Sequence, residues 1–285
     1  MTKTILLFPL LLSSVHTWGL AGSRRGLLRS GGAGILGGNW ARAASAAPAP
    51  AQSLGETNKV VRTVEGIRHK RLGGTDIVVS EMGLGTQRWG GTDFNSPDEE
   101  LCHKMLDRAV LRGGINLVDT AEQYPIPSSA AHPEGDTERI LGSWMAKDKT
   151  RRQKLVIASK ITGGRNVNRA NIESDLEGSL KRLGTDYLDV YLLHWPARYT
   201  PQANWGQSLE YKLEYDRLST RRAPFEEVAD AMSALVQKGK IRGWGICNDN
   251  CYGLMASIAA AKAAGGSPPC VMQEGDLPPI CRDLP

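Results

Sequence analysis

The first 55 residues of this 285-residue chain contain no Asp or Glu. Five basic residues lie in the same stretch, namely Lys3, Arg24, Arg25, Arg29 and Arg42. The whole chain has 35 Lys and Arg against 30 Asp and Glu, so residues 56–285 are balanced at 30 against 30 once these five are set aside. The excess positive charge therefore belongs to the N-terminal stretch, and the composition predicts no nucleic-acid-binding surface on the rest of the chain.

Cysteine is also scarce, and its pattern argues against a zinc-binding domain and against a disulfide-stabilised domain. The five cysteines include no CxxC pair, and no histidine lies close enough in sequence to suggest a zinc site. An odd number argues against a disulfide framework, so we expect reduced thiols and no metal. After the N-terminal stretch no run is long and apolar enough to predict a membrane span.

Residues 1–55 are predicted to be a targeting leader, outside the fold. Lys3 precedes the apolar run ILLFPLLL, which has the length of a signal-peptide core and is too short to span a membrane. The following stretch, rich in Arg, Gly, Ala and Ser, resembles a transit peptide. A signal followed by a transit-like segment favours a plastid enclosed by extra membranes. Mitochondrial import, secretion and a tail with no targeting role are the alternatives.

Beyond residue 65 the sequence alternates between predicted strands and helices. Residues 196–224 interrupt the alternation as a long polar and aromatic insertion without a period. Strands are expected at 80–86, 115–121, 154–161, 186–195, 241–247 and 270–273, and helices at 96–114, 136–147, 171–184, 224–240 and 250–266.

Local signals set the ends of the first elements. Residues 67–80 predict a hairpin that turns at Gly73 and Gly74. The first helix is predicted to begin after Ser96 as N-cap, with Glu99 completing a capping box.

Six strands separated by five helices predict parallel βαβ units. A doubly wound sheet and a (β/α)8 barrel both meet this pattern. The doubly wound fold would carry a glycine-rich fingerprint after its first strand, and GLGTQRWGG at 83–91 does not match G-x-G-x-x-G. We therefore predict an α/β chain of the (β/α)8 TIM-barrel type, in which the C-terminal ends of the strands meet on one face and carry the chemistry.

Polar residues stand at the predicted C-terminal ends of these strands. They are Asp119, Lys160, His194, Asn248 and Gln273, and Tyr124 follows Asp119 on the next loop. Four of these residues have a purely structural interpretation when each is taken alone. The aspartate could be a cap, the lysine a solvated strand end, the tyrosine a surface anchor and the histidine a hydrogen-bonded core residue. In a barrel, however, all six would face one opening.

Four motifs in order decide between these interpretations. They are DTAEQYP, IASK, YLLHWP and GKIRGWGICN, and EMGLGT precedes them. The motifs and their spacing, over roughly residues 67–273, resemble the aldo-keto reductases, a family of (β/α)8 barrels that use NADPH. The resemblance implies reduction of an aldehyde or ketone to an alcohol.

The resemblance implies a role in proton transfer for four residues, Tyr124, Lys160, Asp119 and His194. Tyr124 would be the general acid that protonates the carbonyl oxygen, and Lys160 would lower the pKa of its phenol. Asp119 would pair with Lys160 and keep it charged and oriented. His194 would orient the carbonyl through a ring nitrogen.

Other residues would hold the cofactor and the substrate. Asn248 and Gln273 would bind the nicotinamide carboxamide of NADPH, with Thr86 bordering the same site. Trp89 and Trp195 would line the substrate pocket, although core packing explains two tryptophans equally well. Cys247, where the family usually has Ser, is interpreted as a tolerated small residue. The expected partner is a small-molecule carbonyl compound.

The tail, residues 274–285, departs from the family pattern. QEGDLPPICRDLP from Gln273 contains Pro278, Pro279 and Pro285, which disfavour strand and helix alike. We expect a C-terminally truncated member that lacks the last two βα units; a divergent short protein is the alternative. A non-catalytic regulatory protein, as in the potassium-channel beta-subunit branch, or an inactive fragment are the competing functions.

Overall fold

The computed structural model describes residues 59–91, 96–198 and 223–273. Contacts along the chain separate Met1–Pro50 from Ala51–Pro285. The predicted leader, most of the predicted insertion at 196–224 and the divergent tail at 274–285 lie outside the described residues. Those three predictions therefore stay predictions, and the fold below is that of the second unit.

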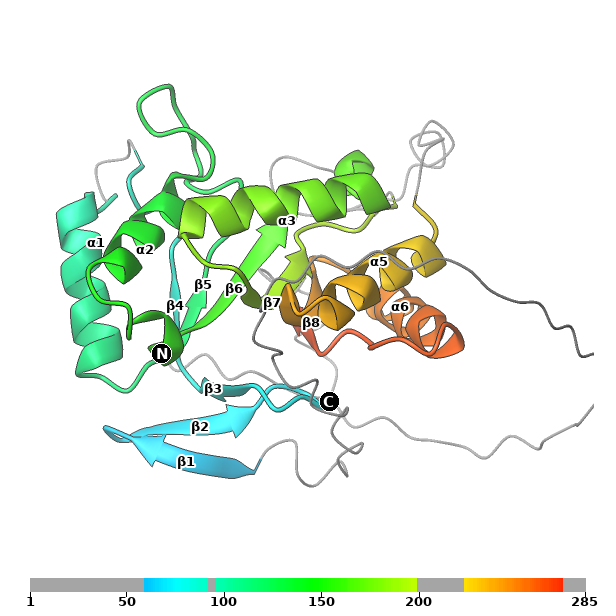
Figure 1. Cartoon of the computed structure of the whole chain (residues 1–285), viewed down its shortest axis with the longest axis horizontal. Coiled ribbons are helices and arrows are strands. Elements are labelled where there is room, and N and C mark those ends of the chain that lie inside the picture. The colour runs from blue at the N-terminus through cyan, green and yellow to red at the C-terminus, as the bar shows by residue number, and fades with distance from the viewer. Residues whose placement is uncertain (1–58, 92–95, 199–222, 274–285) are drawn as a thin grey trace, which may run out of the picture. The chain divides into compact units, whose positions relative to one another are not determined.

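The central element is a parallel sheet of six strands, and its order follows the sequence without reversal. Figure 1 shows β4 to β8 side by side in this order. The strands are β4 (Gly83–Gly85), β5 (Leu117–Asp119), β6 (Val156–Ile161), β7 (Leu188–Leu193), β8 (Ile241–Cys247) and β9 (Val271–Gln273). A doubly wound sheet would reverse its strand order at a switch point. The continuous order is that of a (β/α)8 barrel, here a curled partial barrel.

Within the described residues, five helices follow strands β4 to β8 and pack in the same order. Each contacts the next one along the chain, which places them in a single layer on one side of the sheet. They are α1 (Glu99–Leu106), α2 (Asp136–Ala146), α3 (Arg169–Leu183), α5 (Phe225–Gln237) and α6 (Cys251–Ala263). Single-turn segments accompany them, η1 (Asp107–Leu111), η2 (Arg152–Lys154) and η3 (Gly164–Asn166). The predicted alternation of six strands and five helices is confirmed.

A three-stranded antiparallel sheet precedes the parallel one. It consists of β1 (Val60–Val64), β2 (Ile67–Arg71) and β3 (Val78–Ser80). The predicted β2–β3 hairpin is confirmed, and its turn includes Gly73 at φ +54, where a Cβ atom would lie 2.5 Å from the Cys270 carbonyl oxygen. The strand β1 was not predicted, because all five of its residues are exposed and it shows no alternation.

The N-cap of α1 differs from the prediction. Asp98, not Ser96, caps this helix, and its carboxylate accepts a hydrogen bond from the Leu101 amide at 2.8 Å. Ser, Pro and Asp are adjacent here, and both polar residues are favourable caps. The helix therefore begins at Glu99, which is its first residue and not the third residue of a capping box.

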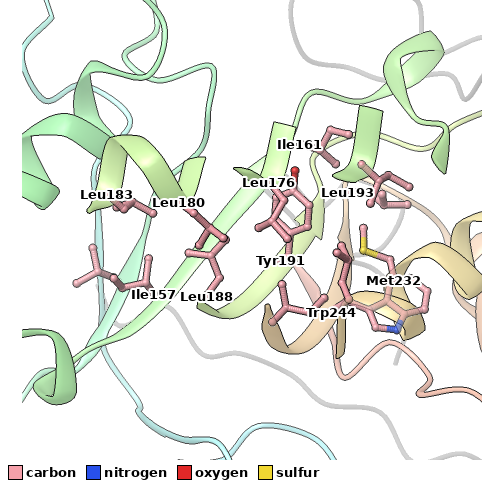
Figure 2. Packing of buried hydrophobic residues seen from close by; sticks show 14 of the residues in the cluster. Ile157, Ile161, Leu176, Leu180, Leu183, Leu188, Tyr191, Leu193, Met232 and Trp244 are labelled. Carbon is pink, nitrogen blue, oxygen red and sulfur yellow. The ribbon is translucent and has the colours of Figure 1, made fainter. Parts of the chain in front are cut away.

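Alternate residues of the strands build two apolar clusters. On the helix side, Ile157, Ile161, Tyr191 and Leu193 of β6 and β7 pack with the apolar face of α3, as Figure 2 shows. That face is the predicted one, with Ile172, Leu176, Leu180 and Leu183 all buried. The opposite side of the same strands forms the inner cluster, which also takes Ile77 and Val79 from the β3 region. Its strand members include Val156, Ala158, Val190 and Leu192.

This alternation positions the polar strand ends. Lys160 continues the series Val156 and Ala158, and His194 continues the series Val190 and Leu192. Because side chains two residues apart lie on the same face of a strand, both polar side chains belong to the inner face. The apolar inner cluster therefore lies below them and supports the site.

Candidate active site

Lys160 is the centre of the site. Its side chain is 1% exposed, and its ammonium donates to the Asp119 carboxylate at 2.8 Å and to the Thr120 carbonyl oxygen at 2.8 Å. The two residues come from the paired strands β5 and β6, in which Asp119 lies opposite Ala158. A buried ammonium is stable only when it is paired and hydrogen-bonded, and this geometry meets both conditions.

Tyr124 completes a three-residue group with this pair. Its hydroxyl lies 3.3 Å from the Lys160 ammonium, and the residue is 6% exposed. The ammonium also lies 4.9 Å from the centre of the tyrosine ring. The loop returns the tyrosine over β6 because the Tyr124 amide donates to the Ala121 carbonyl and the Gly135 amide donates to the Tyr124 carbonyl. The predicted meeting of Asp119, Lys160 and Tyr124 is thus present in the structure.

The pKa values of this group show one departure from expectation. Burial raises the pKa of the Tyr124 phenol, and the positive charge of Lys160 offsets only part of that effect, so the pKa lies above its usual value. The sequence predicted that Lys160 would bring it below that value. Burial lowers the pKa of Lys160 in turn, but the Asp119 carboxylate and Tyr124 raise it more, so the net shift is upward. The ammonium therefore stays charged and the phenol stays protonated at neutral pH.

His194 lies directly after β7 and closes one side of the group. Its ring contacts the Tyr124 ring edge to face, with centroids 5.6 Å apart, and the residue is 6% exposed. Burial, with a smaller contribution from Lys160, lowers the pKa of His194 to about 3. The ring is therefore neutral at physiological pH and has one donor and one acceptor nitrogen. Its Nδ1 is buried without a hydrogen-bond partner among the described residues.

The three predicted cofactor residues lie at the ends of neighbouring strands. Thr86 is fully buried after β4, and both its amide and its hydroxyl donate to the Asp119 carbonyl oxygen at 3.0 Å. Asn248 follows β8 with φ +54, and its amide nitrogen donates to the His194 carbonyl at 2.9 Å. The Asn248 backbone amide donates to the carbonyl of Gln273, the last residue of β9, at 3.1 Å. These three residues therefore border the Lys160 group from both sides.

The two predicted pocket tryptophans have different environments. Trp195 is half-buried and stacks on the His194 ring, with centroids 6.0 Å apart and an interplanar angle of 21°. Trp89 is 3% exposed and belongs to the hydrophobic core cluster on the helix side. Packing therefore explains the position of Trp89, and its contact with substrate stays a prediction.

Two residues that received no role from the sequence belong to this site. Cys247 is 4% exposed, its sulfur accepts a hydrogen bond from the Asn248 side chain at 3.2 Å, and its proximity adds to the upward shifts of the pKa values of both Tyr124 and Lys160. The alternation along β8 was the signal that could have placed Cys247 on the inner face. Glu122 is the second residue, and its side chain accepts a hydrogen bond from the Thr162 amide.

Two further classes of site are absent from the described residues. No group of three or more His, Cys, Asp or Glu side chains there has an arrangement that could hold a metal ion. None of the helices in residues 59–91, 96–198 and 223–273 has the length and apolar character of a membrane span.

Comparison with known proteins identifies the family. The model of the aldo/keto reductase family matches residues 81–275, which include every predicted site residue. The chain belongs to the aldo/keto reductase family. It is 40% identical over 209 residues to protein Tas of Escherichia coli, and 33% identical over 189 residues to the aldo-keto reductase YhdN of Bacillus subtilis.

The extent of these matches is partial on both sides. They cover 68% and 64% of this chain, and only 56% of Tas and 47% of YhdN, so the chain spans about half the length of these relatives. A crystal structure of the thermostable aldo-keto reductase Tm1743 with the inhibitor epalrestat matches with a TM-score of 0.52 and 30% identity. The match covers 72% of this chain and 61% of the Tm1743 chain.

Family membership supports a coarse chemical assignment. Aldo/keto reductases are oxidoreductases that use nicotinamide cofactors on small-molecule carbonyl compounds, and this chain has the family's fold. The amide side chains of Asn248 and Gln273 are on the adjacent strand ends of β8 and β9, and such side chains are suited to pair with a carboxamide. Side chains of the type that could hydrogen-bond the carboxamide of such a cofactor therefore stand at these two strand ends.

Proposed function

We propose that the chain is an NADPH-dependent carbonyl reductase in which Tyr124 donates the proton and the product is an alcohol. The observation that carries the proposal is the 3.3 Å contact between the Tyr124 hydroxyl and a Lys160 ammonium that Asp119 holds in place. A phenol beside a fixed cation can release its proton because the resulting phenolate is stabilised.

The proton transfer is derived from these residues. As the carbonyl carbon is reduced, negative charge develops on its oxygen, and the Tyr124 proton moves to that oxygen. The phenolate that remains faces the Lys160 ammonium, whose charge Asp119 maintains. The pKa of Tyr124 lies above its usual value because of burial, so the donor is fully protonated before each turnover. NADPH, when bound, supplies the hydride.

His194 and the amide residues would determine the orientation of the reactants. The neutral His194 ring can donate one hydrogen bond to the carbonyl oxygen without competing as an acid, because its pKa is about 3. Asn248 and Gln273 would hold the nicotinamide carboxamide, with Thr86 beside them. Trp195 stacks on His194 and is suited to form a wall for the substrate, and Trp89 would support it from the core.

Loss of NADPH absorbance on addition of para-nitrobenzaldehyde tests this proposal. Tyr124→Phe removes only the hydroxyl and is expected to lower kcat by about a hundredfold or more, since general acid catalysis contributes that order. Tyr187→Phe is the matched control, because Tyr187 lies beside Arg152, whose guanidinium is 3.9 Å from its ring centre, and outside the site. Turnover that survives in Tyr124→Phe would show that another group donates the proton.

The same preparation separates the catalytic and the regulatory alternatives. NADPH titration followed by fluorescence, with NADH for comparison, measures binding independently of turnover. Binding without turnover on any carbonyl compound would favour a non-catalytic regulatory protein. Neither binding nor turnover, together with a non-cooperative thermal melt, would favour an inactive fragment.

We also propose that residues 1–55 deliver the chain to a plastid. The support is the series of a signal-like apolar run and an acid-free, Arg-rich stretch in the sequence. Fusion of these residues to a fluorescent protein tests the proposal in cells that contain such a plastid. Accumulation in mitochondria or in the medium would favour the alternatives instead.

A further inference from the structure

The β5–β6 hydrogen-bond ladder continues into the loop that carries Tyr124. Beyond the end of β5, the Thr120 amide donates to the Ala158 carbonyl at 2.8 Å, and the Glu122 amide donates to the Lys160 carbonyl at 3.3 Å. The next amide on the β6 side belongs to Thr162. Its hydrogen bond goes to the side chain of Glu122, not to a backbone carbonyl of the loop.

The Glu122 side chain therefore replaces a backbone acceptor at the point where the loop turns away. The turn follows at once, with the Tyr124 amide donating to the Ala121 carbonyl at 3.1 Å. Glu122 lies two residues before Tyr124, and Thr162 lies two residues after Lys160. One hydrogen bond thus joins the two segments that bring the phenol within 3.3 Å of the ammonium.

Loss of the hydrogen bond between Glu122 and the Thr162 amide would affect the loop that carries Tyr124. The residue is partly buried, and burial raises the pKa of Glu122. A backbone amide that loses its acceptor in such surroundings retains a desolvation cost, so the loop would move to recover a partner. Movement of the loop changes the separation of Tyr124 and Lys160, because only Gln123 lies between Glu122 and the tyrosine in the same turn.

We propose that Glu122 is a positioning residue, which sets the Tyr124 hydroxyl against Lys160 by accepting a hydrogen bond from the Thr162 amide. The kinetic part of this inference rests on the proposed reductase function. The geometric part does not, since the contact between the phenol and the ammonium exists in the protein without turnover.

Three variants test the proposal by kinetics. Glu122→Met keeps the side-chain length and removes the acceptor, and Glu122→Gln keeps an acceptor oxygen. Glu227→Met is the matched control, because Glu227 accepts a hydrogen bond from the Arg169 amide at 2.9 Å, at the start of α3 and away from Tyr124. We expect Glu122→Met to lower kcat by about ten- to a hundredfold with little change in KM, since displacements near 1 Å cost rates of that order. The Gln variant and the control should stay close to the original rate.

Titration of the Tyr124 phenol tests the geometry without any turnover. Tyrosinate absorbance is measured for each protein and for its counterpart with Tyr124→Phe, and the difference gives the pKa of Tyr124. We expect Glu122→Met to move this pKa by about one unit, because both burial and the nearby charge depend on position. Glu122→Gln and Glu227→Met should leave it unchanged.

The outcomes separate this inference from the proposed function. If no variant reduces any carbonyl compound but the pKa of Tyr124 moves only in Glu122→Met, the positioning role stands and the proposed reductase function fails. Unchanged kcat and unchanged pKa in Glu122→Met would overturn the positioning role. Equal loss in Glu122→Gln and Glu122→Met would also overturn it, because the acceptor oxygen would then be irrelevant. If Glu122→Met fails to fold, Glu122→Ala is tested as an additional variant without the acceptor. If it also fails to fold while Glu227→Met folds, Glu122 is a stability residue and the inference is wrong.

Discussion

The buried histidine His194 should make the stability of this protein depend on pH. The pKa of His194 falls from 6.5 in the unfolded chain to about 3 in the folded one, through burial and the charge of Lys160. As pH drops below 6.5, His194 becomes protonated in the unfolded chain but stays neutral in the folded chain. The contribution to stability is therefore complete above pH 6.5 and is lost as pH falls toward 3. This one residue should cost about 2 kcal/mol between about pH 7.5 and pH 5.

Urea unfolding of the original chain and of His194→Gln at those two pH values measures this effect. The original chain should lose about 2 kcal/mol more than the variant on acidification, because all other titrating groups are common to both proteins. Both proteins should first show a single cooperative transition with equal slopes, so that the free energies are comparable. Equal losses in the two proteins would refute the reasoning, since they would mean that folded His194 accepts a proton as readily as the unfolded chain.

Three further substitutions test the packing around the site. Glu138→Ala removes a fully buried carboxylate that accepts 2.6 Å hydrogen bonds from Arg182 and Ser159. It should lower the free energy of unfolding in urea by about 3 kcal/mol. The control Glu100→Ala, at an exposed ion pair, should change that free energy little. Leu176→Ala should cost about 3 kcal/mol in the same assay, because this α3 side chain is fully buried. Gly163→Ala places a Cβ atom against Trp195, so we expect a change in tryptophan fluorescence and weaker carbonyl binding; an unchanged spectrum would contradict the close approach of Gly163 to Trp195.

Local and periodic signals were sufficient for most of the described elements. The α3 pattern was confirmed because apolar residues at spacings of three and four can be buried together on only one face of a helix. The exposed strand β1 lacked any such alternation, since neither of its faces is buried. The α1 cap was predicted at the wrong residue because Ser96 and Asp98 are both favourable caps. In the structure the backbone is still extended at Asp98 and becomes helical at Glu99, so Asp98 is the residue that caps the helix.

In the candidate site, too, residues in a sequence motif were predictable, and a residue that acts through a long-range contact was not. The order of Asp119, Tyr124, Lys160 and His194 was sufficient to recognise the family, because strand ends of a parallel barrel meet on one face. Glu122 gave no signal, because its hydrogen bond joins positions 40 residues apart. The role of a side chain that replaces a ladder acceptor depends on where the partner strand lies.

By itself, the sequence determined the strand and helix order, the apolar faces and the identity of the residues at the strand ends. These follow from periodicity and position, which are local properties of the chain. Only the tertiary structure decided the protonation of the site. Burial raised the pKa of Tyr124 where a neighbouring cation alone would have lowered it, and burial made His194 neutral. Desolvation depends on everything packed around a group, so no motif can state its size.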